Sequence, residues 1–211
     1  GADAERTVSQ APELIAAAKK SPAVLAGAPF VSAQGMVMRG QELRGVQVRG
    51  IDPVTEKDVS QVGSQMVRGR LTDLKAGEFG IVLGVELAQS LGVVLGDKVV
   101  LMAPQGQFTP TGVVPRIKQF TVVGLFQIGM YEYDAGLALI NIDDAAKLYR
   151  MGDNVSGVRL KLDDLFLAPK ISTDLAVVLS NETQALFLTD WTQEHANFFR
   201  AIQMEDRKSV V

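Results

Sequence analysis

Hydrophobic and polar positions alternate clearly in residues 43–51. The apolar positions of this segment are Leu43, Val46, Val48 and Ile51, and arginine and glutamine residues lie between them. Such alternation predicts a strand with one buried and one solvated face. Residues 23–38 carry branched and small side chains typical of a strand, and Arg39-Gly40-Gln41 is typical of a turn. We therefore expect a β-hairpin in the first quarter of the chain.

The rest of the chain combines short strands with short helices. We expect further strands at residues 78–83, 99–102, 120–126, 137–142, 155–162 and 185–188. We expect helices at residues 7–20, 84–91, 144–149, 166–179 and 190–207, and a polar, irregular stretch with a short helix at 54–76. Gly92 and Asp143 are candidate caps, and Asp190-Trp191-Thr192-Gln193 resembles a capping box. This order predicts an α+β fold rather than a regular parallel βαβ array.

Composition places the chain among globular proteins and excludes several functions. Of its 211 residues, 47% are apolar and 21% are charged, and the net charge of −3 argues against broad binding to a phosphate backbone. The absence of cysteine excludes thiol catalysis, thiolate metal sites and disulfides. No apolar stretch of about eighteen residues and no signal peptide is found. The two ends are typical of an excised domain, with any transmembrane segments absent from this chain.

One segment, residues 104–115, differs from an ordinary connection. It lies between the strand-like runs 98–103 and 119–125, where a hairpin normally needs only about two to five loop residues. Prolines stand at both ends and near the middle, so we expect a stiff loop of about twelve residues with a reversal at Pro110-Thr111-Gly112. The loop is apolar and uncharged between Gln105 and Pro115. Two interpretations stand at similar weight: a loop folded back on the domain, or a protruding arm that docks on another protein.

Candidate catalytic chemistry is sparse. His195, the single histidine, lies inside the last expected helix and has no evident partner to orient it. The acidic pairs Asp143-Asp144 and Asp163-Asp164 are better explained by a helix cap and a solvated turn, and Gly80–Gly84 is a weak signal for phosphate binding. Three arginines either mark an acidic partner or, as we favour, belong to a solvated sheet face: Arg39, Arg44 and Arg49. We expect no catalytic residue, no metal site and no cofactor.

Several motifs together carry a resemblance that covers nearly the whole chain. They are Gly50-Ile-Asp-Pro53, Ile81-Val-Leu-Gly84, Leu91-Gly-Val93, Gly96-Asp97, Gln107-Phe-Thr-Pro-Thr-Gly-Val-Val-Pro115, Phe120-Thr-Val-Val-Gly-Leu-Phe126, Asn141-Ile-Asp-Asp-Ala145, Asp190-Trp191 and Phe199-Arg-Ala-Ile-Gln-Met-Glu205. On these residues the chain resembles the periplasmic domains of lipoprotein-releasing ABC transporter permeases of the LolC/LolE type. Each motif alone is weak, whereas the set is specific.

The resemblance implies a fold, a location and a partner. It implies a MacB-like periplasmic domain of an inner-membrane protein, with a Porter-like subdomain from residues 1–54 and 151–211 and an inserted Sabre-like subdomain, 55–150. In this family a β-hairpin called the Hook, here residues 104–116, captures the periplasmic lipoprotein chaperone LolA. The residues it implies for partner binding are Pro104, Phe108, Thr109, Pro110, Thr111, Gly112, Val113, Val114, Pro115, Arg116 and Lys118. It further implies a partner permease, LolE-like or a second identical copy, a separate LolD-like cytoplasmic ATPase, and a lipoprotein substrate.

Some residues depart from the family pattern. A polar pad beside the Hook maps to Lys118, but the neighbouring pad positions are the apolar Ile117 and Val100, and Thr111 stands where a methionine is expected near the tip. Residues 151–166 are more similar to the LolE branch, so the chain also resembles the fused LolF type. Two alternatives stay open: a mechanotransmission domain of a MacB-type efflux permease, and an enzyme using His195.

Overall fold

The computed structural model describes residues 11–20, 22, 24–162, 186–191 and 198–203, of which 105–108, 162, 186–191 and 198–203 are described by their backbone alone. The chain divides into two compact units. Unit 1 contains residues 1–30, 55–59 and 153–211, and unit 2 contains residues 31–54 and 60–152. Strand β1 (Val24–Arg39) begins in unit 1 and ends in unit 2.

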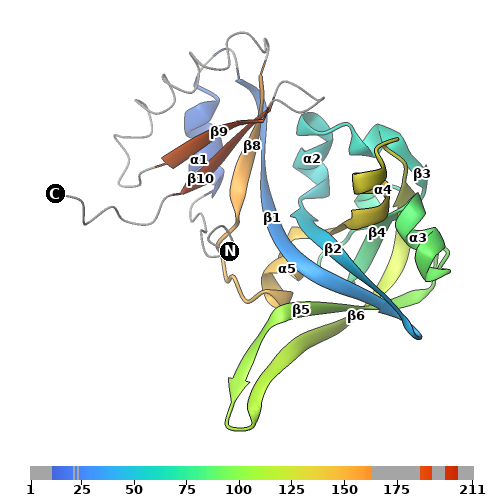
Figure 1. Cartoon of the computed structure of the whole chain (residues 1–211). Coiled ribbons are helices and arrows are strands. Elements are labelled where there is room, and N and C mark those ends of the chain that lie inside the picture. The colour runs from blue at the N-terminus through green and yellow to red at the C-terminus, as the bar shows by residue number, and fades with distance from the viewer. Residues whose placement is uncertain (1–10, 21, 23, 163–185, 192–197, 204–211) are drawn as a thin grey trace. The chain divides into compact units, whose positions relative to one another are not determined.

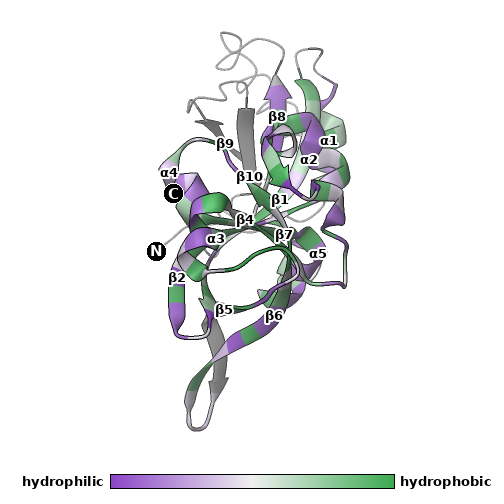
Figure 2. Cartoon of the chain, turned by 90° about the vertical axis from the view of Figure 1, so that its right-hand side faces the viewer, coloured by the Kyte–Doolittle hydropathy of each residue, from purple (hydrophilic) through white to green (hydrophobic). Residues whose placement is uncertain are grey.

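A closed ring of strands forms the body of unit 2 (Figure 1). The strands are β1, β2 (Glu42–Ile51), β7 (Leu137–Asn141), β4 (Gly80–Gly84), β6 (Gly112–Phe126) and β5 (Lys98–Thr109). They are hydrogen-bonded in that order, and pairing of β1 with β2 closes the circuit, which Figure 2 shows nearly end-on. A short strand, β3 (Met66–Arg68), joins β6 outside this circuit. Closure leaves the ring with few unpaired edges.

A cluster of buried apolar side chains stabilises unit 2 where β2, β4, β6 and β7 meet the segment 62–74. It contains Ile51, Val62, Leu71, Leu74, Val82, Phe126, Leu137 and Leu139. The pairs β2–β7 and β4–β6 are parallel, whereas β4–β7, β5–β6 and β1–β5 are antiparallel. This mixture of pairings, with helices in the connections, confirms the expected α+β class.

Short helices connect the strands of unit 2. They are α3 (Val85–Leu91), α4 (Tyr131–Gly136) and α5 (Ile142–Leu148), with 3₁₀ turns at Val62–Gln65 and Leu71–Asp73. Gly92 ends α3 in the left-handed conformation, with φ of 68°, which confirms the expected cap. The cap expected at Asp143 is wrong, because the side chain of Asn141 accepts the hydrogen bond from the backbone N–H of Asp143. The helix begins at Ile142, two residues earlier than the acidic pair suggested.

Unit 1 is a smaller sheet, and two described helices contact it. Strand β1 pairs with β8 (Gly157–Leu162), β8 with β10 (Phe198–Gln203), and β10 with β9 (Leu186–Trp191), all antiparallel. Helix α1 (Ala11–Ala18) contacts β8, and Gly27 leaves room for its Ile15. Helix α2 (Pro53–Val59) is tied to β8 by a buried ion pair of 3.2 Å between Glu56 Oε1 and Arg159 Nη1.

Two expectations for the C-terminal part have different outcomes. The helix expected at 190–207 is wrong, because residues 186–191 and 198–203 are paired strands. Both segments are rich in aromatic and branched residues, and the pairing of β9 with β10, and of β10 with β8, overrides the local capping-box signal. The helix expected at 166–179 lies outside the described residues. The assignment of Porter-like and Sabre-like subdomains stays a prediction; residues 31–54 group with the strand ring.

Candidate functional site

The candidate site is the arm, residues 104–116, which extends from the ring of unit 2 (Figure 1). The expected twelve-residue loop is wrong: β5 continues to Thr109 and β6 begins at Gly112. The ladder changes register between Ala103, which pairs with Arg116, and Gln107, which pairs with Val114. Residues 104–106 therefore stand against Pro115 alone.

This irregularity explains how two strands accommodate so many prolines. Pro104 and Pro115 both lie where the register changes, a place in which a missing N–H donor breaks no regular ladder bond. Pro110 lies in the turn itself. The prolines that suggested a long loop therefore interrupt a β-ribbon at one place and reverse it at another.

The tip of the arm is a two-residue turn, Pro110-Thr111, as expected from the sequence. Gly112 adopts φ of 129°, a conformation that favours glycine. The hydroxyl of Thr109 donates to the carbonyl oxygen of Gly112 at 2.7 Å and lies 3.1 Å from the hydroxyl of Thr111. Since the Thr109 proton is used on Gly112, the Thr111 hydroxyl is the donor of the second bond. These bonds order a tip whose residues 110–112 are exposed to solvent.

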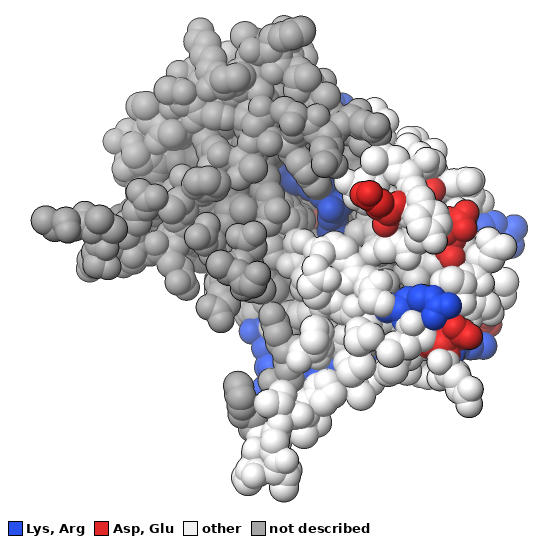
Figure 3. Space-filling model, in the orientation of Figure 1, with Lys and Arg blue, Asp and Glu red and all other residues white. Residues whose placement is uncertain are grey.

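Apolar side chains of the arm are exposed to solvent. Val113 and Val114 are 55% and 52% exposed, and Ile117, just beyond the arm, is 56% exposed. Pro104, Pro110, Thr111, Gly112 and Pro115 are exposed as well. Phe108 pairs with Val113 through its backbone, and its side chain lies outside the described part of the chain. Figure 3 shows the far end of the arm without charged side chains on the face in view.

The two basic candidates at the base of the arm have different surroundings. Lys118 is exposed, with its Nζ 4.3 Å from the centre of the Phe79 ring. Arg116 is partly buried, and its Nη1 donates to the carbonyl oxygen of Leu148 at 3.2 Å. Burial, and secondarily the charge of Arg150, lower the pKa of Arg116. Lys118 is thus available to a partner, whereas Arg116 is engaged within the domain.

Three residues beside the arm were missed by sequence reasoning: Phe79, Asp144 and Lys147. Phe79 has φ of 53°, unusual for a residue with a large side chain. Asp144 is buried and accepts hydrogen bonds from the N–H groups of Gly77 and Phe79. The only sequence signal for this arrangement was the second acidic residue of the Asp143-Asp144 pair, which we attributed to helix capping.

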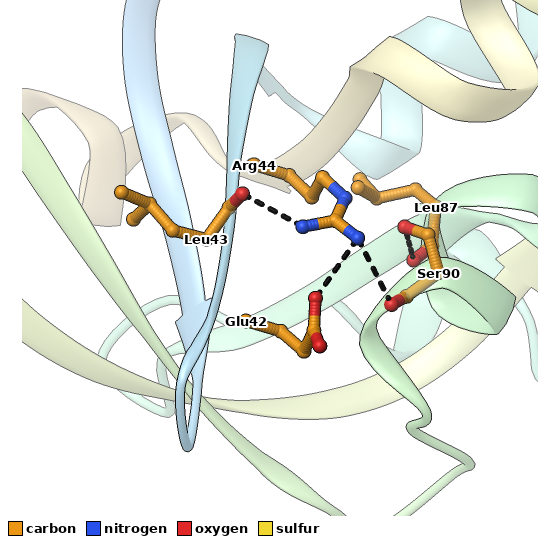
Figure 4. Close-up of polar contacts among 5 residues, drawn as sticks. All are labelled: Glu42, Leu43, Arg44, Leu87 and Ser90. Carbon is orange, nitrogen blue, oxygen red and sulfur yellow. Dashed lines mark hydrogen bonds and ion pairs between the residues drawn. The ribbon is translucent and has the colours of Figure 1, made fainter.

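Arg39 and Arg44 of the early hairpin make contacts within unit 2. Figure 4 shows that Arg44 contacts Glu42 at 2.9 Å, donates to the carbonyl of Leu43, and reaches the carbonyl of Ser90 at the end of α3. Arg39 donates to the carbonyl of Lys98 at 2.6 Å and lies 3.9 Å from Asp97. These contacts favour the interpretation of a solvated sheet face.

Alternative chemistry finds little support in the described part of the chain. No group of three or more His, Asp or Glu side chains suited to a metal ion occurs among the residues that the structure describes. His195 lies outside those residues. None of the described helices is both long and apolar enough to cross a membrane.

Comparison with known proteins defines the class. Residues 2–178 match the family of MacB-like periplasmic core domains, and the chain therefore belongs to that family. Two solved structures share the fold at low identity. The extracellular domain of the transporter YknZ from Gram-positive bacteria has a TM-score of 0.56 at 15% identity, covering 83% of this chain and 84% of that one. The periplasmic region of MacB from Actinobacillus actinomycetemcomitans has a TM-score of 0.54 at 13% identity, covering 92% and 79%.

Within this class the chain is most informatively compared with LolC and LolE. It is 44% identical over 188 residues to the lipoprotein-releasing system transmembrane protein LolC of Neisseria meningitidis serogroup B, covering 89% of this chain and 45% of that protein. LolC of Xylella fastidiosa is 41% identical over 90% of this chain and 45% of its own length. LolE of Haemophilus influenzae is 28% identical over 88% and 44%. These relatives confirm the resemblance drawn from sequence, and the chain spans less than half of their length.

Proposed function

We propose that this chain is the periplasmic domain of a lipoprotein-releasing ABC transporter permease, and that its arm is a Hook recruiting a LolA-like periplasmic chaperone. The observation that carries the proposal is an ordered β-ribbon extending beyond the core, with two exposed valines and an exposed proline at its end. Similarity to LolC over most of the chain supports the setting in lipoprotein release.

The physical argument concerns what such a ribbon can do. Exposed apolar side chains on an ordered element bury surface on binding without a large ordering cost, because the turn and ladder are already formed. The proposed apolar contacts are Phe108, Pro110, Val113 and Val114, with Pro104, Thr109, Thr111, Gly112 and Pro115 completing the surface. Lys118 is proposed to steer the partner electrostatically. Arg116 is also a proposed contact, but it lies at the edge of the contact surface because its guanidinium already donates to Leu148.

The wider setting is part of the same proposal. The domain carries out no bond chemistry itself. ATP is hydrolysed by a separate LolD-like cytoplasmic subunit, the permease pairs with a LolE-like subunit or with a second identical copy, and the chaperone accepts a lipoprotein destined for the outer membrane. In the intact inner-membrane protein, the transmembrane segments flank this periplasmic domain, whose ends and middle form Porter-like and Sabre-like subdomains.

The test uses charges placed on the arm. Thr111→Asp combined with Val113→Asp puts two carboxylates on the proposed contact surface, and binding to the purified chaperone, measured by calorimetry, is expected to be lost. Both positions are exposed, so the free energy of unfolding should change by less than about 0.5 kcal/mol per site.

A matched control carries the same substitutions elsewhere on unit 2. Thr72→Asp with Val54→Asp adds the same charge at exposed positions away from the arm and should bind like the parent chain. Replacement of residues 105–115 by Asn-Gly, a sequence favoured in short hairpin turns, should also remove binding. Unchanged affinity of the arm variants for the chaperone would contradict the Hook assignment.

A mechanotransmission domain of a MacB-type efflux permease is the second candidate. The fold shared with the periplasmic region of MacB favours it. This candidate predicts no affinity for a soluble chaperone, so the same calorimetric experiment on the parent chain separates the two.

A further inference from the structure

Helix α5 is linked at both of its ends to β6, the strand that leads into the arm. Asp144, in the first turn of this helix, reaches β6 through Phe79, and Leu148, its last residue, is bonded to Arg116 of β6. These links concern what fixes the direction of the arm. Their effect on partner binding rests on the proposed function, in which the arm docks on a chaperone.

The first link begins at the buried carboxylate of Asp144. It accepts from the N–H of Gly77 at 2.7 Å and from the N–H of Phe79 at 3.1 Å. The carbonyl oxygen of Phe79 in turn accepts from the N–H of Thr121 on β6 at 3.0 Å. The backbone of Phe79 is thus fixed on both sides in a left-handed conformation that is unfavourable for a large residue. Observed strain of this kind points to a role for the side chain that it places.

The side chain placed in this way is an aromatic platform under β6. The Phe79 ring meets the ring of Phe120 edge-on, with centroids 5.6 Å apart and planes at 80°. The Nζ of Lys118 lies 4.3 Å from the Phe79 centroid, and the Nζ of Lys147, on α5, lies 6.0 Å from it. Both distances fall within the range of cation–π attraction. One ring therefore joins β6 to α5 through two ammonium groups.

The second link is at the opposite end of α5. The chain leaves this end through Arg150, which has φ of 49°, while the N–H groups of Tyr149 and Met151 satisfy the carbonyls of Ala145 and Ala146. The carbonyl of Leu148 receives its bond from the guanidinium of Arg116. A cation at a helix C-terminus also interacts favourably with the helix dipole. Arg116 lies next to the register change at which the ribbon leaves the ring.

We propose that α5 braces the arm, with Phe79 and Arg116 acting as positioning residues that fix the direction in which the arm leaves the ring. Phe79 lies outside the proposed contact set, and Arg116 takes this role through its bond to Leu148, in addition to its place at the edge of that set. A braced arm presents its tip in one orientation, so a larger fraction of molecules is competent to dock. Loss of either link allows the ribbon to swing about its base at the register change.

Arm direction is measured directly in the absence of a partner. The chain contains no cysteine, so spin labels on Thr111→Cys and Thr72→Cys report only the distance between arm tip and ring. The distance distribution should be narrow in the parent and broaden at least about twofold in Arg116→Ala and Phe79→Asn, as expected when docking-competent orientations become a minor population. Asparagine is chosen because it tolerates the left-handed conformation and removes only the ring.

Partner binding supplies the second readout. Arg116→Ala and Phe79→Asn should weaken chaperone binding about 5- to 30-fold, mainly through a slower association rate constant, because fewer arms are oriented to dock. Loss of a direct contact would instead accelerate dissociation. Arg116→Lys keeps a donor and a charge for the Leu148 carbonyl and should recover part of the loss. Arg68→Ala and Tyr131→Asn, exposed positions on unit 2, are the matched controls and should behave like the parent.

The outcomes separate this inference from the proposed function. A distribution that stays narrow in both variants overturns the brace, whatever the chaperone does. Broadening without a loss of affinity, or a loss confined to faster dissociation, overturns the positioning role. If the parent chain does not bind the chaperone at all, the Hook proposal falls, and the distance distributions alone decide whether α5 braces the arm.

Discussion

The same two strands, β5 and β6, have opposite surroundings at their two ends. In the ring their inward side chains are fully buried, as at Leu101 and Phe120 with 0% exposure. In the arm Val113 and Val114 are more than half exposed, although the backbone pairing continues through both parts. The comparison separates what backbone pairing supplies from what side-chain burial supplies.

The difference indicates that the arm is held by local interactions and the ring by its core. The arm has a turn, a threonine hydroxyl bond and contacts at its base with α5, and residues 110–114 at its tip are exposed to solvent. Its apolar residues therefore contribute little to folding and remain available for binding. The substitutions below should follow this division, from the largest expected effect to the smallest.

The strongest contrast sets a ring residue against an arm residue. Phe120→Ala should lower the free energy of unfolding by about 3–5 kcal/mol, because it removes a fully buried ring. Val113→Ala should change it by less than about 0.5 kcal/mol. Urea denaturation followed by circular dichroism measures both. If both variants lost a comparable amount of unfolding free energy, the arm tip would have to pack on the domain, and the proposed difference between ring and arm would be wrong.

A second substitution tests the polar support of the ring beside the arm. Asp144→Asn should destabilise the domain by about 1.5–3 kcal/mol, because two N–H groups lose a charged acceptor. Thermal unfolding measures this effect. Asp143→Asn, on the same helix but exposed, is the control and should have little effect. Equal effects at the two sites would assign the loss to helix charge rather than to the loop around Phe79.

Tyr149, which follows α5, makes the stability of unit 2 depend on pH. Its hydroxyl donates to the carbonyl of Gln34 at 2.7 Å, and burial raises the pKa of Tyr149. The unfolded chain therefore releases this proton first, and stability should fall as pH rises above about 10. Tyr149→Phe should cost about 1 kcal/mol at neutral pH and flatten that fall. A parallel decline in both proteins across pH 9–11 would contradict the assignment.

The smallest effect is expected at the arm tip. Thr109→Val removes the hydroxyl bond to Gly112 but should leave the free energy of unfolding within about 0.5 kcal/mol of the parent. Hydrogen exchange at the backbone amides of residues 112–114 should become faster, while the amides of the ring are unchanged. In the parent protein, the amides of the ring should already exchange more slowly than those of the arm, and this difference is the baseline of the experiment. A global change in exchange would show that tip and ring are one cooperative unit.

Much of the ring was predictable from sequence because its signals are local. Alternation identified the early hairpin, Gly92 marked the end of α3, and short apolar runs marked β4 and β7. The arm was mistaken for a loop because three prolines were counted as if each blocked a strand. Two of them lie together at one register change, which is a property of the pairing and not of either strand alone.

The contacts that position the arm could not be predicted for a related reason. Asp144, Phe79 and Arg116 come from three distant segments, and only the ring brings them together. The C-terminal strands illustrate the same limit: a capping-box pattern at Asp190 favoured a helix, and pairing across β8 to β10 decided for strands. Long-range pairing is decided by partners that lie far away in the sequence.

The position of the arm's two strands within the ring has a mechanical consequence. Within the ring, β6 pairs with β5 on one side and, from Thr121 onward, with β4 on the other, and β5 pairs with β6 and, at residues 100–102, with β1, so neither is an edge strand there. A load applied along the ribbon is therefore shared by hydrogen bonds on both flanks of each strand and acts on them in shear, not one at a time. The ring should serve as a stiff anchor from which a bound partner can be pulled or turned without drawing out the strands that hold it.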